Sequence, residues 1–496
     1  MSQQKKPVIL VHGWSVHNTS TYGELPARLE AETSNEIPLD IHNIWLGKYV
    51  SFQDEVQLDD ISRAFESAIR NELDDASLKT KCVCITHSTG GPVIRNWIFK
   101  FYIEPGKMDD CPVSHLIMLA PANFGSALAI LGKIRLSRIK SWIEGVEPGK
   151  GVLDWLELGS PESWDLNVKW MNYFKGLQQN ESFFPFVISG QSIDRSFYDH
   201  VNAYTGELGS DGVVRLAGAN LNANYFKFIQ ESPTTDTTEL ALSIVGGEHI
   251  TPDKTAFAIA KGRSHSGDDM GILKSIKKGK DLHPTVKLIL DCIRVNTGGD
   301  YTSLCSQFEI QSAQVMKEEQ VEVEDLFLLK DRYFIHDPYS MLIFRIRDEY
   351  GNAIGNYDII FTGGDDDNEN HLPENFLADK QRNSRASGFI TFYFNTMVML
   401  GSEPVKIQNK VVRKKLAGAK SFGFKIVPYT DKGFVHFLPA VLKGTPELLA
   451  KLLVPNQTTL VDIVMKRIVH EGVFQLTQDR GPEEFKDVEP GGMVLK

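Results

Sequence analysis

The sequence predicts an α/β fold, with a parallel sheet covered by helices, followed by a smaller domain of antiparallel strands. Strand-like and helix-like segments alternate through the first 125 residues, which is typical of a parallel sheet with helices on both faces. After residue 300, short β-rich runs separated by turns replace this alternation and predict a β-sandwich-like domain. A chain of 496 residues also exceeds what one hydrophobic core normally supports.

The alternating segments can be placed one by one. In the helix expected over residues 58–73, apolar side chains recur at helical spacing, at Leu58, Ile61, Phe65, Ile69 and Leu73. The expected strands cover residues 7–13, 39–47, 81–88 and 113–123, and the other expected helices cover residues 22–32 and 91–102.

Residues 126–182 interrupt the alternation and contain four of the seven tryptophans, Trp142, Trp155, Trp164 and Trp170. One interpretation is a cap or lid over a site, and the other is a helical insertion packed as ordinary core. Strand-like runs resume at residues 184–191 and 256–262, and a helix at 283–294 would close the domain. We therefore expect an α/β domain over residues 1–300, with the insertion at 126–182, and a β-rich domain over residues 301–496.

Charge and cysteine content exclude several classes of protein. The formal net charge of -11 disfavours a nucleic-acid partner, and the five cysteines, an odd number, argue against a disulfide framework. The N-terminal apolar run is too short for a signal peptide, and no window holds the roughly 18 apolar residues of a spanning helix. We expect a soluble chain without a transmembrane segment, cytoplasmic by default or exported by a route that needs no signal peptide.

The stretch VCITHSTGGP, residues 83–92, places a serine between an expected buried strand and an expected helix. A serine at such a sharp turn projects its hydroxyl into a site, and the pattern G-x-S-x-G is typical of a nucleophile elbow. Here the pattern is Thr86-His87-Ser88-Thr89-Gly90, with a threonine in place of the first glycine. The alternative is a serine that merely turns a corner between strand and helix.

A serine nucleophile needs a base and an acid that orients the base, in the chain order Ser, Asp, His for this kind of elbow. Asp211, in LGSDGVVRL, and His265, in AKGRSHSGDDMGIL, follow expected strands in that order. His249 is the rival base, although it precedes the last expected strand. Asp194 and Asp199 are the rival acids.

An oxyanion needs two hydrogen-bond donors near the serine. The N–H of Thr89 is one candidate, because the first N–H groups of a helix have no partner within the helix. The second candidate is the N–H of Trp14, since His12-Gly13 after the first strand allows the backbone to turn inward. The alternative is that His12-Gly13 is a simple turn at the end of a strand.

Taken together, these motifs resemble the α/β-hydrolase superfamily and, within it, the bacterial lipases and lipase-like phospholipases. The resemblance covers roughly residues 5–295 and rests on HGW, THSTGG, APANFGS, SDGVV and the late histidine. It implies a triad of Ser88, Asp211 and His265, an oxyanion hole at Trp14 and Thr89, and no required cofactor. Some members bind a structural calcium near the histidine loop, where Asp268 and Asp269 lie here, but a full ligand set is missing.

The function we expect is a serine carboxylester hydrolase that acts on lipid at a membrane or micelle interface. Phospholipase A1 and triacylglycerol lipase are the two leading activities, and the sequence does not separate them. An acyltransferase using the same triad and a non-catalytic lipid-binding protein are the alternatives. Delivery as an antibacterial lipase effector is a further interpretation, suggested by the absence of a signal peptide.

Overall fold

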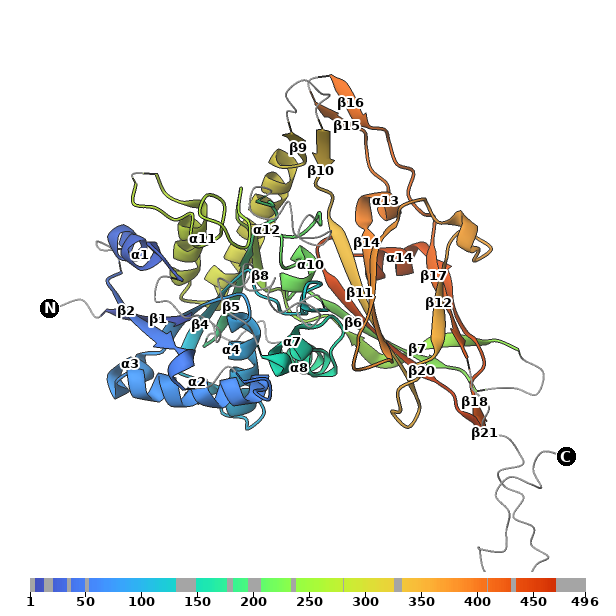
Figure 1. Cartoon of the computed structure of the whole chain (residues 1–496), viewed down its shortest axis with the longest axis horizontal. Coiled ribbons are helices and arrows are strands. Elements are labelled where there is room, and N and C mark those ends of the chain that lie inside the picture. The colour runs from blue at the N-terminus through green and yellow to red at the C-terminus, as the bar shows by residue number, and fades with distance from the viewer. Residues whose placement is uncertain are drawn as a thin grey trace, which may run out of the picture.

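The computed structural model describes residues 5–12, 21–33, 37–49, 53–130, 149–175, 182–194, 207–232, 238–279, 281–324, 332–407, 409–429 and 434–469. Figure 1 shows two units side by side, a parallel sheet with its helices on the left and a curled sheet, largely orange and red, on the right. This arrangement confirms the expected α/β domain with a β domain after it.

The first sheet contains six described strands, all parallel to their neighbours. Its cores form on both faces because successive side chains of a strand alternate in direction. On the first strand, Val8 and Leu10 enter one core, and Ile9 and Val11 enter the other. In spatial order the strands are β2 (Leu39–Trp45), β1 (Lys6–His12), β3 (Cys82–His87), β4 (Val113–Leu119), β5 (Phe184–Ser189) and β8 (Ala256–Ile259).

Helices cover both faces of this sheet. α2 (Leu58–Glu72) and α4 (Gly90–Ile98) pack on one face, and Ile61, Phe65 and Ile69 of α2 are buried there as their spacing predicted. The opposite face is covered by α1 (Leu25–Thr33), α11 (Pro284–Ile293) and α12 (Gly298–Glu318). Shorter elements complete the domain: η1 (Leu46–Lys48), α3 (Asp75–Thr80), η2 (Phe99–Ile103), η3 (Met108–Asp110) and α10 (Leu216–Ala219).

The second sheet has nine described strands of mixed direction. The pairs β11·β20, β20·β6 and β19·β7 are parallel, and the other pairs are antiparallel. In spatial order the strands are β12 (Tyr357–Thr362), β17 (Phe422–Pro428), β19 (Ala440–Thr445), β7 (Leu240–Ile250), β6 (Asn224–Gln230), β20 (Thr458–Met465), β11 (Tyr339–Asp348), β14 (Phe389–Asn395) and β13 (Leu377–Arg382).

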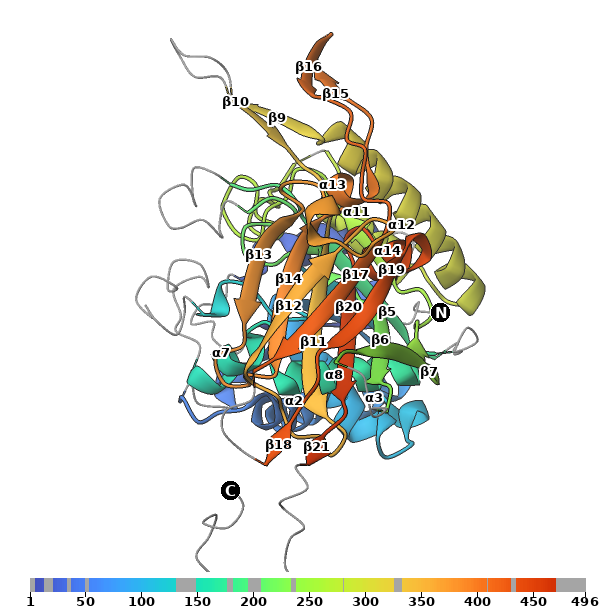
Figure 2. The same ribbon diagram turned by 90° about the vertical axis from the view of Figure 1, so that its right-hand side faces the viewer.

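This sheet curls so that strands far apart in its order face each other, as Figure 2 shows. Phe361 of β12 contacts Phe394 of β14 with ring centroids 5.1 Å apart, and Phe344 of β11 contacts Phe424 of β17 at 5.2 Å. The expected sandwich-like core is therefore present, but one curled, mixed sheet encloses it. The expected antiparallel pairing holds for most neighbouring strands of this sheet, and three pairs differ because long connections return some strands in parallel.

Two strands from before residue 300, β6 and β7, belong to the second sheet. The expected domain boundary at residue 300 therefore does not coincide with the division between the two sheets. β6 and β7 pair with β20 and β19, respectively. Helix α12, in contrast, starts at the expected boundary and packs against β8 of the first sheet. The side chains of Ser312 and Tyr301 accept hydrogen bonds from the Ile259 and Ala256 N–H groups, at 3.0 and 3.1 Å. The helix thereby satisfies the open edge of the first sheet.

The insertion is described at α7 (Lys150–Leu156) and α8 (Pro161–Tyr173), which are built into the core. Trp155, Trp164 and Trp170 are all buried, and Trp164 packs between Tyr225 and Phe389 of the second sheet. For these three tryptophans the structure supports the core interpretation. Trp142 lies outside the described residues.

All five cysteines are buried, and none of them forms a disulfide. Among the described residues, no helix is long and apolar enough to cross a membrane. The short elements of the second domain are η4 (Glu369–His371), α13 (Thr396–Leu400), α14 (Pro446–Leu452) and three antiparallel pairs of short strands, β9 (Val321–Glu324) with β10 (Arg332–Ile335), β15 (Val405–Ile407) with β16 (Lys410–Arg413), and β18 (Val435–His436) with β21 (Ile468–Val469).

Candidate active site

Ser88 lies at the sharp turn between β3 and α4, at the carboxyl end of a central strand. Its φ of +54° is in the left-handed region, which is uncommon for any residue other than glycine. Such strain persists only where the surrounding structure holds it, and it concentrates at functional sites. The Ser88 N–H donates to the Leu119 carbonyl at 2.9 Å, which fixes the turn against β4.

Two glycines make this turn fit. A Cβ on Gly91 would lie 2.7 Å from Cβ of Pro121, and a Cβ on Gly90 would lie 3.2 Å from Cβ of Thr86. The threonine at the first small position of the motif is therefore accommodated because the residue facing it has no side chain. The departure from G-x-S-x-G leaves the geometry of the elbow intact.

The structure brings Ser88, His265 and Asp211 together from three separate segments. His265 follows β8, and its Nε2 lies 3.1 Å from Oγ of Ser88. The other ring nitrogen, Nδ1, lies 2.9 Å from Oδ2 of Asp211, which follows β5. These strands are parallel neighbours or near neighbours, so their carboxyl ends meet at one edge of the sheet.

Asp211 is held in place by backbone groups. Its Oδ1 accepts hydrogen bonds from the N–H groups of Val213 and Val214, at 3.0 and 2.8 Å, and its carbonyl accepts from the His265 N–H at 2.9 Å. Asp211 is fully buried and His265 is 4% exposed, so the pair is shielded from water. Such a carboxylate can hold the imidazole in one tautomer and one orientation.

The rival residues lie elsewhere or outside the described part of the chain. His249 is on β7 of the second sheet, where its ring stacks on Phe226 with centroids 4.2 Å apart. Asp194 is buried beside Gly267, in the loop that carries His265, but Nδ1 of His265 contacts Asp211. Asp199 lies outside the described residues.

Of the two predicted oxyanion donors, Thr89 and Trp14, Thr89 is the one that lies among the described residues. Thr89 is the N-cap residue of α4 and lies at the positive end of the helix dipole. Trp14 lies outside the described residues, as does Gly13 before it. The oxyanion roles of Thr89 and Trp14 both stay predictions.

The site contains a second histidine, His87, for which the sequence motifs predicted no role. The ring of His87 is 4.9 Å from that of His265, at an interplanar angle of 39°. Burial lowers the pKa of His87 well below its ordinary value, and the neighbouring His265 adds to the decrease. His87 is therefore a neutral ring beside the candidate base. The sequence did contain a signal, because His87 directly precedes Ser88.

The described residues include no group of three or more His, Cys, Asp or Glu side chains that could hold a metal ion. Asp268 and Asp269, considered for a structural calcium, are both exposed. The described residues of the site offer a candidate nucleophile, a candidate base and an acid that orients the base.

This fold and elbow define the class of protein: a carboxylic ester hydrolase of the α/β-hydrolase superfamily, in its lipase-like branch. Solved structures of phospholipase PlaB from Legionella pneumophila are similar over nearly the whole chain. One is 39% identical with a TM-score of 0.84 and covers 98% of this chain and 99% of that one. Another, in complex with thio-NAD, is 37% identical with a TM-score of 0.82 and covers 97% and 98%. The chain belongs to the PlaB phospholipase family.

No protein-family model and no curated protein matches the chain. The structural similarity nevertheless extends through both domains, including the β domain for which the sequence suggested no relative. It confirms the predicted lipase-like branch and the predicted ester hydrolase.

Proposed function

We propose that the protein is a phospholipase that cleaves acyl esters of glycerophospholipids through an acyl-enzyme on Ser88. The observation that carries the proposal is the continuous chain of contacts from Ser88 Oγ to His265 Nε2, at 3.1 Å, and from His265 Nδ1 to Asp211 Oδ2, at 2.9 Å. The strained φ of Ser88 supports it independently.

In the first half-reaction, Ser88 Oγ attacks the ester carbonyl carbon while His265 Nε2 takes the hydroxyl proton. The tetrahedral oxyanion accepts hydrogen bonds from the N–H groups of Thr89 and Trp14. When the C–O bond breaks, His265 returns the proton to the leaving alcohol, which departs as a lysophospholipid. Asp211 stays ionised throughout and stabilises the transient imidazolium.

In the second half-reaction, His265 takes a proton from water, and the resulting nucleophile attacks the acyl carbon bound to Ser88. Collapse of this second tetrahedral species breaks the bond to Oγ, and His265 reprotonates Ser88. The free fatty acid leaves. The buried position of Asp211 helps here because electrostatic stabilisation is stronger where water is excluded.

The family relationship favours phospholipid over acylglycerol, because the similar solved structures are of a phospholipase. The finer activity proposed is phospholipase A1, with cleavage at the first glycerol position. A lipid aggregate, a membrane or a micelle, would present this substrate.

The test uses the full chain and a phosphatidylcholine with palmitate at the first position and oleate at the second, with products identified by mass spectrometry. We expect palmitate and an oleoyl lysophospholipid, and a loss on the order of 10⁴-fold in the Ser88→Ala variant. Oleate as the first product would refute the A1 preference. Release of acid from triacylglycerol alone would refute the phospholipid class, and an unaffected Ser88→Ala variant would refute the nucleophile.

A further inference from the structure

The loop that carries Asp211 is closed at its base by a buried ion pair. Arg215 donates to both carboxylate oxygens of Glu207, from Nε at 2.8 Å and from Nη2 at 2.7 Å. Between these two residues, Ser210 and Arg215 form an isolated antiparallel bridge, and the Asp211 N–H donates to the Val214 carbonyl at 3.1 Å. The conformation of this turn therefore determines where the Asp211 carboxylate lies.

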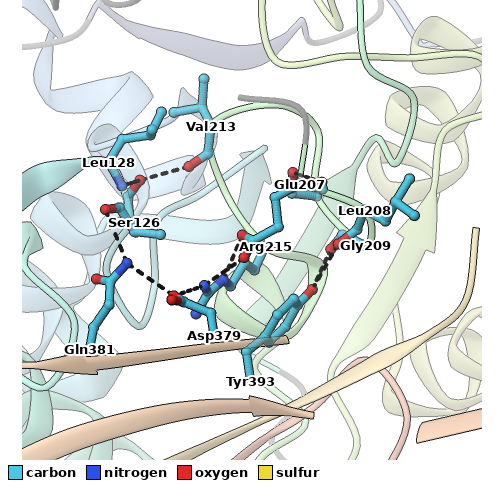
Figure 3. Close-up of polar contacts among 12 residues, drawn as sticks. Ser126, Leu128, Glu207, Leu208, Gly209, Val213, Arg215, Asp379, Gln381 and Tyr393 are labelled. Carbon is cyan, nitrogen blue, oxygen red and sulfur yellow. Dashed lines mark hydrogen bonds and ion pairs between the residues drawn. The ribbon is translucent and has the colours of Figure 1, made fainter. Parts of the chain in front are cut away.

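Arg215 is also held from the second domain, as Figure 3 shows. Its Nη2 donates to Oδ2 of Asp379, on edge strand β13. Its guanidinium lies over the ring of Tyr393, on β14, 4.1 Å from the centroid. Arg215 is 3% exposed, so its charge is balanced almost entirely by these neighbours. Burial alone would lower the pKa of Arg215, but Glu207 and, less strongly, Asp379 raise it above its usual value.

The second domain positions these two side chains by its strand pairing. Asp379 and Tyr393 are direct partners in the β13·β14 register, and the register shifts between Leu377 and Asp379. A bulge at the edge of a sheet redirects the side chain beside it, and bulges of this kind occur next to active sites. The irregularity here lies at the residue that reaches Arg215.

The loop also rests directly on the aromatic side chains of the second sheet. The Tyr393 hydroxyl donates to the Gly209 carbonyl at 3.0 Å. A Cβ on Gly209 would lie 2.5 Å from Tyr339 and 2.6 Å from the Tyr393 hydroxyl oxygen, and the φ of Gly209 is +74°. The contact is therefore possible only with glycine at this position, two residues before Asp211.

A second route reaches the same loop from the other side. The Ser126 hydroxyl donates to the Val213 carbonyl at 2.6 Å, next to an N–H that binds the Asp211 carboxylate. Gln381 of β13 donates to Asp379 at 3.1 Å and to the Ala127 carbonyl at 3.5 Å (Figure 3). Asp379 and Gln381 thus connect both supports of the loop to one edge strand.

We propose that Asp379 and Tyr393 of the β domain are positioning residues for the reaction, because they fix the Arg215–Glu207 closure that places Asp211 against His265. The inference rests on the proposed triad. Removing the Asp379 charge leaves Arg215 buried with one fewer anion, and the turn relaxes to recover solvation. A shift of about 1 Å at a catalytic group lowers the rate about 10²-fold.

The test compares Asp379→Asn and Tyr393→Phe with the parent enzyme, using the full chain. Three quantities are measured: the second-order rate at which a fluorophosphonate labels Ser88, the separate kcat and KM on a water-soluble short-chain ester, and the thermal midpoint. The labelling rate needs an oriented His265 and no lipid interface. A downfield proton resonance from the His265–Asp211 hydrogen bond gives a spectroscopic signature of its geometry.

The matched control is Asp462→Asn. Asp462 is a buried carboxylate in the same β domain, and it accepts hydrogen bonds from Arg345 and Arg347 without contacting the 207–215 loop. We expect Asp379→Asn to slow labelling by about 10- to 100-fold and to lower kcat with KM unchanged. Tyr393→Phe should have the same effect to a smaller degree. Asp462→Asn should leave labelling and the resonance unchanged.

Two results would overturn the inference: unchanged labelling in both variants, or losses that the Asp462→Asn control shares in proportion to its lowered thermal midpoint. Asp211→Asn separates this failure from failure of the triad. If Asp211→Asn labels as fast as the parent, the triad itself is wrong. If Asp211→Asn is slow but Asp379→Asn and Tyr393→Phe are not, only the positioning role is wrong.

Discussion

The imidazole rings of His87, which directly precedes Ser88, and His265 lie 4.9 Å apart and are inclined by 39°. His265 acquires a positive charge during each half-reaction of the proposed mechanism, so a second cation at this distance would oppose it. Burial keeps His87 uncharged, because it holds the pKa of His87 well below its usual value. The neighbour of the base is thus an uncharged ring.

We therefore predict that His87→Phe keeps most of the activity. The loss should stay well short of the ~10²-fold or more expected when a general base is removed. The acid limb of the kcat/KM profile should keep its position, since His87 does not titrate there. A shifted acid limb, or a loss as large as that of His265→Ala, would mean that His87 takes part in proton transfer.

The elbow offers a change that should stabilise the protein without affecting catalysis. Thr86 is fully buried, and its hydroxyl has no hydrogen-bond partner among the described residues. Thr86→Val keeps the shape and removes the unpaired polar atom, so the free energy of unfolding should rise by about 1 kcal/mol. Denaturant unfolding and ester hydrolysis together check this. A less stable variant would imply that the hydroxyl has a partner.

Gly91→Ala is the contrasting variant at the same turn. Its Cβ would lie 2.7 Å from Cβ of Pro121, and the backbone around Ser88 must move to relieve the contact. We expect both the thermal midpoint and kcat to fall. An unchanged kcat would show that the elbow tolerates movement.

The residues of the candidate triad and the elbow could be predicted from the sequence, because each of them depends on a short contiguous segment of the chain. Ser88, Asp211 and His265 each follow an apolar strand, and a parallel sheet brings the carboxyl ends of such strands together whatever lies between them. Each of these three residues could therefore be identified from the sequence of its own segment. The elbow could be identified in the same way, since strand, turn and helix are contiguous.

The contacts between the domains could not be predicted, because they depend on pairing over long separations. Arg215 meets Asp379 through a bulged register of β13 and β14, and β6 joins a strand more than 200 residues later in the chain. The strand period says which face is buried, but it does not select the partner. The tryptophans of the insertion are ambiguous for the same reason, since a lid face and an interdomain core are both apolar.

Substitution of Trp164 distinguishes the lid interpretation from the core interpretation. Its ring lies 5.5 Å from that of Phe389 and 6.2 Å from that of Tyr225, with the Arg345 guanidinium 5.0 Å from its centroid. Trp164→Ala should cost about 3 to 5 kcal/mol of stability. Hydrolysis of acetate and long-chain esters should fall by equal factors. A selective loss on long chains at an unchanged thermal midpoint would restore the lid interpretation for this residue.

His115 gives a prediction about acid stability, away from the active site. Its Nε2 lies 2.8 Å from the Val295 carbonyl, its Nδ1 lies 2.8 Å from the Ser114 hydroxyl, and its ring stacks on Phe186. Burial, helped by the charge of Lys6, lowers the pKa of His115 to about 3. The folded protein therefore keeps this ring neutral well below the pH at which an unfolded histidine binds a proton, near about 6.5.

The sign of the effect follows from proton counting. Above about pH 6.5 neither state is protonated at His115, and its full contribution to stability is present. As the pH falls from about 6.5 towards 3, the unfolded chain takes up a proton that the folded chain does not. The free energy of unfolding then falls by up to about 1.4 kcal/mol per pH unit from this one group. His283, whose pKa burial lowers to about 4, acts in the same direction.

His115→Gln retains an N–H donor for the Val295 carbonyl but cannot titrate. We expect this variant to be less stable than the parent at pH 7, because it loses the stacked ring, but to lose stability less steeply between about pH 6 and 4. Urea unfolding at several pH values gives both slopes, and activity at pH 7 confirms that the site is intact. Because acidic groups titrate alike in both proteins, the difference between the slopes isolates His115. Parallel slopes would show that His115 is protonated equally in the folded and unfolded states.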